Sequence, residues 1–166
     1  TASGGADGSG NYARKHNPAM TFTEINSNPT ACARHITDLS AFTPTAADFS
    51  LIVPNLCHDM HDCSVKTGDD WLSSWLPLNI LNTPTWETGR NAIFITWDEG
   101  DSNKRGGGMV PLIVLSSATP ANTRSTQPYN HYSLLRTIEA SWGLRCLNHS
   151  CETTPMNGLF PSPLSR

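Results

Sequence analysis

Short apolar segments rich in β-branched residues most constrain the fold of this 166-residue chain. They span 49–53, 91–97 and 109–116, and a helix-like apolar pattern over Asp70–Leu81 lies between the first two. Pro77 predicts a kink or an early end of that helix. Strand, helix and strand in this order predict a right-handed crossover and a parallel pair of strands. The predicted fold class is therefore α/β, with helix layers on both sides of a mainly parallel sheet.

Two further helices are indicated by residues that commonly begin or end helices. Asn28-Pro29 precedes a short predicted helix around Thr30–Thr37. Asn130 is expected to cap a longer helix, and Gly143 is a suitable residue at its C-terminal end. The apolar residues of this longer helix fall on one predicted face: Leu134, Leu135, Ile138 and Trp142.

Composition excludes two classes of function. The net charge is −3, and the 11 Lys and Arg residues form no run, which argues against a nucleic-acid partner. No apolar stretch approaches the roughly 20 residues of a transmembrane helix. The chain begins at Thr1 with a Gly-rich segment, so 1–11 is expected to be a linker or loop in a chain cut from a longer one. We expect a domain over 12–160 and a tail at 161–166.

The five cysteines favour an oxidising compartment. Cys57 and Cys63 are close in sequence, as are Cys146 and Cys151, so each pair can form a small disulfide loop. Zinc binding is the alternative, although neither pair has C-x-x-C spacing. Cys32 remains as a buried thiol or as the partner of a cysteine outside this chain.

Polar clusters follow two of the predicted strands. Asp98 and Glu99 end the 91–97 strand, and adjacent carboxylates suit a hard divalent cation, although Asp-Glu-Gly is also common in solvated turns. The segment His58–Asp62 follows the first strand, and its imidazoles and carboxylates can bind metal, hold phosphate oxygens or transfer protons. A polar surface loop is the simpler interpretation. Because sites in parallel sheets lie beyond the carboxyl ends of strands, we expect both clusters to share one cleft.

Two other histidines and one short motif have possible roles. His16 lies in a small basic segment that can attract an anion, although an exposed basic loop has the same composition. His131 begins the last predicted helix, where it can be a ligand or a capping residue. Asn148-His149-Ser150 fits the N-glycosylation sequon, which matters in a eukaryotic host.

Four ordered segments resemble blocks of the phosphoesterase family, which includes acid phosphatases and phospholipases C. They are Tyr12–Pro18, Ile52–His61, Thr96–Gly100 and Asn130–Glu139. The resemblance implies an alkaline-phosphatase-like fold, of which this chain is the incomplete C-terminal part, and a secreted or periplasmic location. The family's N-terminal block, with a Glu-Asn metal-binding pair and the later Ser or Thr nucleophile, has no counterpart here.

The resemblance also implies roles for individual residues. His61, together with Asp59, matches the phosphate-contacting position, and His16 matches the histidine of the His-Asn-Pro block; all three are assigned as catalytic. Asp98 and Glu99 match the acidic pair that binds the catalytic metal. His131 matches a recurrent histidine before the last helix and is assigned to the metal site. The cofactor expected is a divalent ion, Ca²⁺, Mg²⁺, Mn²⁺ or Zn²⁺.

The predicted function is metal-dependent hydrolysis of phosphate esters of the acid phosphatase type. Its partners are a phosphate-ester substrate and the N-terminal segment of the same parent protein, which is expected to carry the nucleophile. The alternatives are a phospholipase C-type phosphodiesterase and a secreted remnant or interaction module without catalytic activity.

Overall fold

The computed structural model describes residues 12–88, 90–117 and 119–160, so the predicted linker at 1–11 and tail at 161–166 lie outside the described residues. The chain divides into two compact units, Thr1–Gly89 and Arg90–Arg166, which are described separately below. A single domain over 12–160 stays a prediction.

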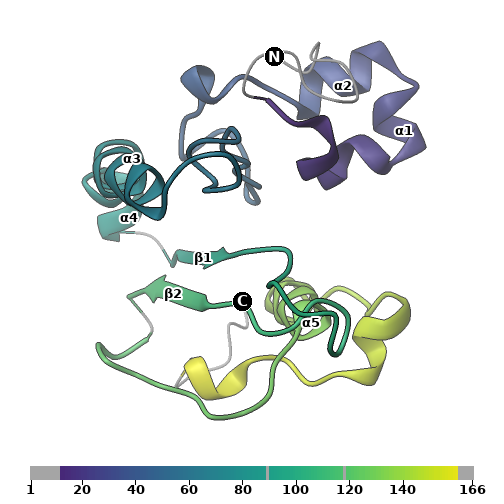
Figure 1. Ribbon diagram of the computed structural model, residues 1–166, viewed down its shortest axis with the longest axis vertical. Helices are drawn as coiled ribbons and strands as arrows, with labels where there is room; N and C mark the ends of the chain where they lie inside the picture. The colour runs from purple at the N-terminus through teal and green to yellow at the C-terminus, as the bar shows by residue number, and fades with distance from the viewer. Residues whose placement is uncertain (1–11, 89, 118, 161–166) are drawn as a thin grey trace. The chain divides into compact units, whose positions relative to one another are not determined.

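The first unit consists of short helices joined by loops (Figure 1). Its helical segments are η1 (Arg14–His16), η2 (Pro18–Thr21), α1 (Thr23–Asn26), α2 (Pro29–His35), η3 (Leu39–Ala41), α3 (Val65–Leu76), η4 (Pro77–Leu81) and α4 (Pro84–Thr88). The Asn28 side chain accepts a hydrogen bond from the Ala31 N–H at 3.1 Å, which confirms the predicted start of α2. Among the described residues, no helix is long and apolar enough to cross a membrane.

Helix α3 carries the first polar loop on its N-terminal side. The helix begins earlier than the predicted Asp70, because Ser64 caps it by accepting a hydrogen bond from the Thr67 N–H at 3.2 Å. Its first turn contains a single apolar residue, the exposed Val65, and therefore lies outside the apolar pattern used for the prediction. Its end at Leu76, directly before Pro77, is as predicted, and the chain continues as a single π-helical turn.

The predicted strand at 49–53 is not formed. These residues have no strand pairing within the described chain, and Phe49 and Leu51 are each more than half exposed. The apolar pattern had indicated a buried strand, but a strand forms only where a neighbouring strand completes its hydrogen bonds. The parallel pair that was predicted from strand, helix and strand is consequently absent from the described residues.

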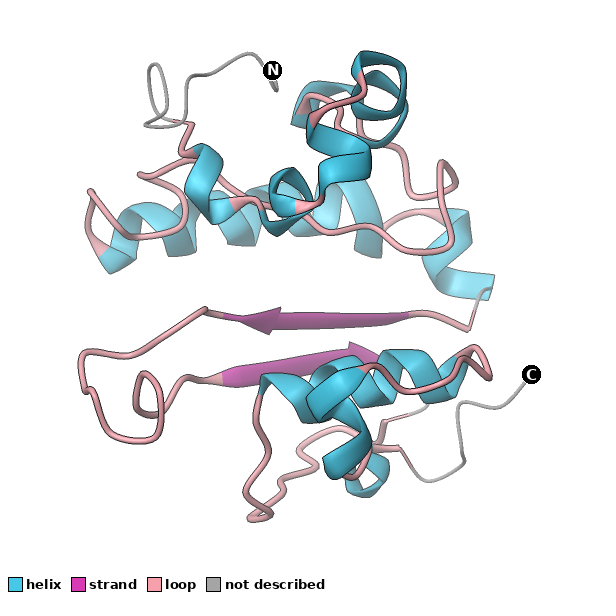
Figure 2. Cartoon of the chain, turned by 90° about the vertical axis from the view of Figure 1, so that its right-hand side faces the viewer, coloured by secondary structure: helices cyan, strands magenta, loops and turns pink. Residues whose placement is uncertain are grey.

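The second unit contains the two later strands, which pair antiparallel. β1 (Ala92–Thr96) and β2 (Leu112–Ser116) lie side by side and run in opposite directions (Figure 2). The register places Ala92 opposite Ser116 and Thr96 opposite Leu112. Both segments were predicted as strands, whereas the sheet was predicted to be parallel. The mixture of helices and a small sheet is consistent with the α/β class.

Helix α5 (His131–Ser141) has the predicted ends. Asn130 accepts a hydrogen bond from the Ser133 N–H at 3.0 Å, and Ser133 reciprocates by accepting from the Asn130 N–H at 3.3 Å. Gly143 has φ of +65°, a conformation that favours glycine and commonly ends helices. The segment after Cys146 contains two 3₁₀ turns, η5 (Asn148–Glu152) and η6 (Asn157–Leu159).

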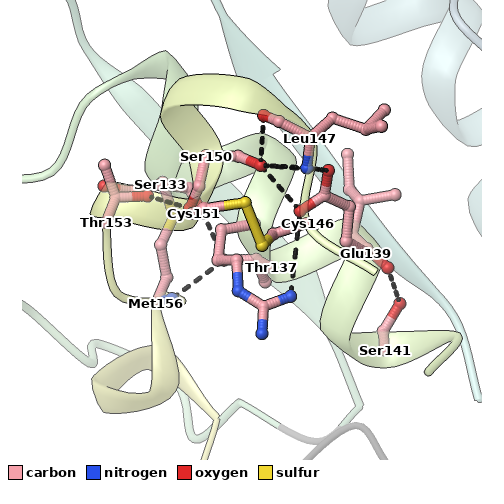
Figure 3. A network of polar contacts seen from close by, with 12 residues as sticks. Ser133, Thr137, Glu139, Ser141, Cys146, Leu147, Ser150, Cys151, Thr153 and Met156 are labelled. Atoms are coloured by element: carbon pink, nitrogen blue, oxygen red, sulfur yellow. Dashed lines mark hydrogen bonds and ion pairs between the residues drawn. A yellow bond between two sulfur atoms is a disulfide. The ribbon is translucent and has the colours of Figure 1, made fainter. Parts of the chain in front are cut away.

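The buried side of α5 is polar, which apolar periodicity did not predict. Its buried residues are Ser133, Thr137 and Glu139, whereas Leu135 is exposed. The Glu139 carboxylate accepts hydrogen bonds from the Ser150 hydroxyl and from the Leu147 N–H (Figure 3). Buried carboxylates are stable only with such partners, so this network fixes the C-terminal segment on α5.

Two disulfides close short loops as predicted. Cys57 is bonded to Cys63 and Cys146 to Cys151, while Cys32 is a half-buried free thiol within the described chain. The Cys57–Cys63 loop contains Asp59 and His61, and the Cys146–Cys151 loop contains Ser150. The disulfides therefore fix loop shape, in addition to any effect on the unfolded chain.

We predict that Asn130→Ala lowers the free energy of unfolding by about 1 kcal/mol, because it removes the side-chain cap of α5. Urea unfolding followed by circular dichroism measures this change. Gln127→Ala, an exposed change just before the helix, is the control. Equal stability of both variants would contradict a capping role for Asn130.

Candidate active site

A histidine and an aspartate 43 residues apart form the centre of the first polar cluster. His16 Nδ1 lies 3.0 Å from Asp59 Oδ2, and the two side chains are 19% and 18% exposed. An ionised carboxylate only accepts hydrogen bonds, so the ring hydrogen lies on Nδ1 of His16. In the neutral ring, Nε2 then carries the lone pair. This is the arrangement that lets a histidine accept or donate a proton at a defined atom.

His61 completes this cluster. Its ring centroid lies 5.2 Å from that of His16. Its backbone N–H donates to Asp59 Oδ1 at 2.8 Å, so the two oxygens of Asp59 have different partners. His61 Nδ1 is 2.7 Å from Asp62 Oδ1, and this pair is about half exposed. Two histidines, each oriented by a carboxylate, thus lie next to each other.

The loop that carries Asp59 and His61 is closed by hydrogen bonds as well as by the Cys57–Cys63 disulfide. Asn55 Oδ1 accepts from the backbone N–H groups of Cys57 at 3.1 Å and His58 at 2.9 Å. The Asp59 N–H donates to the Asn55 carbonyl at 2.9 Å. Asn side chains stabilise tight turns in this way. The 55–63 loop therefore has a fixed local shape.

Gly68 lets this loop lie directly on α3. A Cβ atom at Gly68 would be 2.5 Å from Met60 Cγ and 2.9 Å from the His58 carbonyl oxygen. Met60 has φ of +72°, which is uncommon for a residue with a side chain. The turn at Met60 therefore packs into space that any other residue at position 68 would occupy.

His58 has a packing role rather than a chemical one. Its ring stacks on Trp71 of α3, with centroids 5.1 Å apart and an interplanar angle of 9°. Trp71 stacks on Trp75, and Trp75 contacts Phe42. Within the cluster predicted at His58–Asp62, the structure thus separates a histidine that anchors the loop from His61, which lies beside His16.

The His16 segment is held by its own contacts. The His16 N–H donates to the Ala13 carbonyl at 3.1 Å, and Ala13 is buried. Asn17 Oδ1 accepts from the Ala19 N–H at 3.2 Å and caps η2. The Arg14 guanidinium donates to the Asn26 side chain. These contacts fix the backbone on both sides of His16.

The acidic pair of the second unit, Asp98 and Glu99, follows β1 in a loop that a backbone hydrogen bond closes. Asp98 and Glu99 are exposed, and the Gly100 N–H donates to the Gly107 carbonyl across the loop at 2.6 Å. Gly107 has φ of +125°, and a Cβ there would lie 3.0 Å from Glu99 Cβ. The glycine-rich segment at 106–108 thus closes against the acidic pair.

His131 lies beside the acidic pair but contacts its backbone. His131 Nε2 is 2.6 Å from the Asp98 carbonyl oxygen. A carbonyl only accepts, so Nε2 donates and the lone pair of a neutral ring lies on Nδ1. The contact joins the N-terminus of α5 to the end of β1.

The donor set of the second unit does not by itself fit a metal ion. Within the described residues, no three or more His, Cys, Asp or Glu side chains are grouped to hold a cation. Asp98 and Glu99 supply oxygen donors, but His131 Nε2 is engaged with a carbonyl. A divalent cation needs several more oxygen ligands than this pair provides. A metal at these residues stays a prediction, as does a cleft shared with Asp59 and His61.

Comparison with known proteins identifies the family. The family model described as the Phosphoesterase family matches residues 5–145. The chain belongs to the phosphoesterase family. The match contains all four segments from which the resemblance was inferred and every predicted site residue.

Curated relatives of this phosphoesterase chain carry phosphatase names. It is 27% identical to an acid phosphatase of Aspergillus fumigatus over 93% of this chain and 40% of the relative. It is 29% identical to a phosphatidylinositol-3-phosphatase of Mycobacterium tuberculosis, over 91% and 48%, respectively. A phosphate-repressible acid phosphatase of Penicillium chrysogenum is 28% identical over 84% and 35%. The chain therefore spans less than half the length of these relatives, and no solved structure matches it significantly.

We predict that Gly68→Ala destabilises this phosphoesterase chain by about 1–3 kcal/mol through overpacking against Met60 and the His58 carbonyl. The usual effect of this change in a helix is opposite in sign, about 1 kcal/mol of stabilisation. Denaturant unfolding measures the difference, with Ser73→Ala on the same helix as control. Stabilisation by both changes would mean that the loop does not lie on Gly68.

We also predict that Asp59→Ala changes the tautomer of His16. ¹⁵N NMR above the titration range of the imidazoles should place the hydrogen on Nδ1 in the wild type and move part of the population to Nε2 in the variant. Asp62→Ala, which removes the partner of His61 instead, is the matched control. An unchanged His16 spectrum in Asp59→Ala would contradict the contact.

Proposed function

We propose that this chain forms part of a phosphoesterase that hydrolyses phosphate monoesters, as an acid phosphatase does. Membership of the family and the names of the relatives support phosphate esters as the substrate class. The observation that carries the proposal is the placement of His16 and His61 beside each other, with Asp59 bound to one ring and to the backbone of the other.

In this proposal, His16 and His61 act on the phosphoryl group. Protonated imidazoles donate hydrogen bonds to phosphoryl oxygens and balance the charge that develops on them. Asp59 holds the Nδ1 hydrogen of His16, so proton transfer occurs at Nε2. Either His16 or His61 protonates the leaving-group oxygen, which suits activity below neutral pH.

Asp98 and Glu99 are proposed to supply two oxygen ligands of a divalent cation, Ca²⁺, Mg²⁺, Mn²⁺ or Zn²⁺, with His131 at the same site. The glycine-rich loop that closes against Glu99 supports this assignment. His131 Nε2 is engaged with the Asp98 carbonyl, so His131 would contribute only its Nδ1 atom. When bound, such a cation supplies positive charge next to phosphate oxygens. Further ligands are needed beyond those of the described residues.

The remainder of the site is proposed to come from the rest of the parent protein. The nucleophile, the additional metal ligands and further strands of a mainly parallel, alkaline-phosphatase-like sheet are assigned to an N-terminal segment. The exposure of Phe49 and Leu51 supports this assignment, because an added strand would cover these apolar side chains. The two disulfides favour a secreted or periplasmic location.

We predict that the complete gene product releases p-nitrophenol from p-nitrophenyl phosphate when divalent metals are supplied. His16→Ala should lower kcat/KM by about 100-fold or more, as expected for loss of a general acid. Asp98→Ala should abolish activity. His35→Ala, an exposed histidine at the end of α2, is the control and should leave activity unchanged. Thr1–Arg166 alone should turn over slowly, because the nucleophile is proposed to lie outside it.

The same assay distinguishes the alternatives. Faster hydrolysis of bis(p-nitrophenyl) phosphate than of the monoester would favour a phospholipase C-type phosphodiesterase. A phosphoinositide carrying a 3-phosphate is a second monoester substrate to test, since one relative is named for it. Absence of turnover with every substrate and metal would favour a secreted module without catalytic activity. Full activity of Thr1–Arg166 would place the nucleophile within this chain.

A further inference from the structure

The sequon at Asn148 combines an exposed acceptor with a buried recognition group. Asn148-His149-Ser150 is the one Asn-x-Ser/Thr motif in the sequence without proline at its middle position. Asn148 is exposed and has φ of +48°, a conformation that asparagine tolerates. Ser150 is 0% exposed. A glycosyltransferase must reach both residues, but only Asn148 is accessible in the folded chain, whereas Ser150 is buried.

Ser150 is committed to the network of α5. Its hydroxyl lies 3.1 and 2.9 Å from the two carboxylate oxygens of Glu139, and its oxygen accepts from the Leu147 N–H at 2.9 Å (Figure 3). Glu139 is itself buried and needs these donors. The Ser150 hydroxyl in the folded chain is therefore engaged with protein atoms and closed to solvent.

The Cys146–Cys151 disulfide encloses the whole sequon. The bond joins residues five apart in sequence, with Asn148 and Ser150 inside the loop. Enzymatic transfer to a sequon requires an open segment in which the Asn amide and the Ser hydroxyl can be bound together. In the structure, η5 is instead a tight 3₁₀ turn whose hydroxyl faces Glu139. Loop closure and enzyme recognition are consequently mutually exclusive.

We propose that Asn148 is an N-glycosylation site that is modified only before Ser150 is buried and the 146–151 loop closes. The donor is a lipid pyrophosphate-linked oligosaccharide in an oxidising secretory compartment. The Asn148 amide nitrogen forms a bond to the anomeric carbon as that carbon's bond to the pyrophosphate oxygen breaks. The amide loses one proton, and the lipid pyrophosphate leaves.

The folded structure accommodates the product. The modified side chain is exposed, whereas the hydroxyl needed for recognition is buried, so a glycan attached early does not displace Ser150 from Glu139. Leu147, the preceding residue, is also exposed. A hydrated oligosaccharide at Asn148 would shield this apolar side chain from other molecules.

The test uses purified complete gene product, in which any sequon outside Thr1–Arg166 has been removed by Asn→Gln substitution, together with an oligosaccharyltransferase and its lipid-linked donor. Reduced and unfolded protein should gain one glycan, detected as a glycosidase-sensitive shift in gel mobility. Native, disulfide-bonded protein should gain none. In the unfolded state, Asn148→Gln and Ser150→Ala should both lose the shift, whereas Asn157→Gln, outside the sequon, should keep it.

Each other outcome overturns part of the proposal. Equal modification of native and unfolded protein would show that burial of Ser150 does not control access. A shift that persists in Asn148→Gln would place the glycan elsewhere, and no shift in unfolded protein would exclude the site. In a yeast secreting the complete protein, the Cys146→Ser/Cys151→Ser variant should show a higher glycosylated fraction than the wild type.

Discussion

The closure of the 55–63 loop is the constraint on which the proposed catalytic cluster depends. Asp59 can bind His16 only because the loop is folded back by Asn55 and the Cys57–Cys63 disulfide. The loop is then held on α3 by two different contacts, the stacking of His58 on Trp71 and the packing of Met60 over Gly68. A polar cluster in the first unit is thus positioned by aromatic packing and by the absence of a side chain, rather than by a sheet.

Local signals predicted local structure well. Asn28 and Asn130 cap helices because their side chains replace missing backbone acceptors, and this requires no tertiary information. Gly143 ends a helix for a similarly local reason. The disulfide pairs followed from short separations along the chain. The strands at 92–96 and 112–116 could be recognised from their β-branched residues.

Features that depend on distant partners could not be predicted in the same way. The apolar run at 49–53 reads as a strand, but its state depends on a neighbour that its own sequence does not specify. The buried face of α5 was missed because Glu139 is buried through donors from Ser150 and Leu147, not through apolar contacts. The proximity of His16 and His61 was not predicted, since spacing cannot relate residues so far apart and the family resemblance gave these residues roles but no distance. Gly68 lies before the predicted helix start at Asp70, so its close packing against Met60 gave no signal in the apolar pattern.

The pairing of Glu139 with Ser150 has a consequence for how this chain can change during evolution. Loss of Ser150 alone leaves a buried carboxylate with fewer donors, and loss of Glu139 alone removes one acceptor from both the Ser150 hydroxyl and the Leu147 N–H. Replacement of both by apolar residues of similar shape removes the carboxylate and its donor together, so its cost is mainly that Arg136 loses its ion-pair partner. Positions 139 and 150 should therefore be substituted together during evolution. A lineage that loses the Glu139 carboxylate should then also lose Ser150 and with it the sequon. A possible attachment point for sugar would then disappear without any selection on the sugar itself.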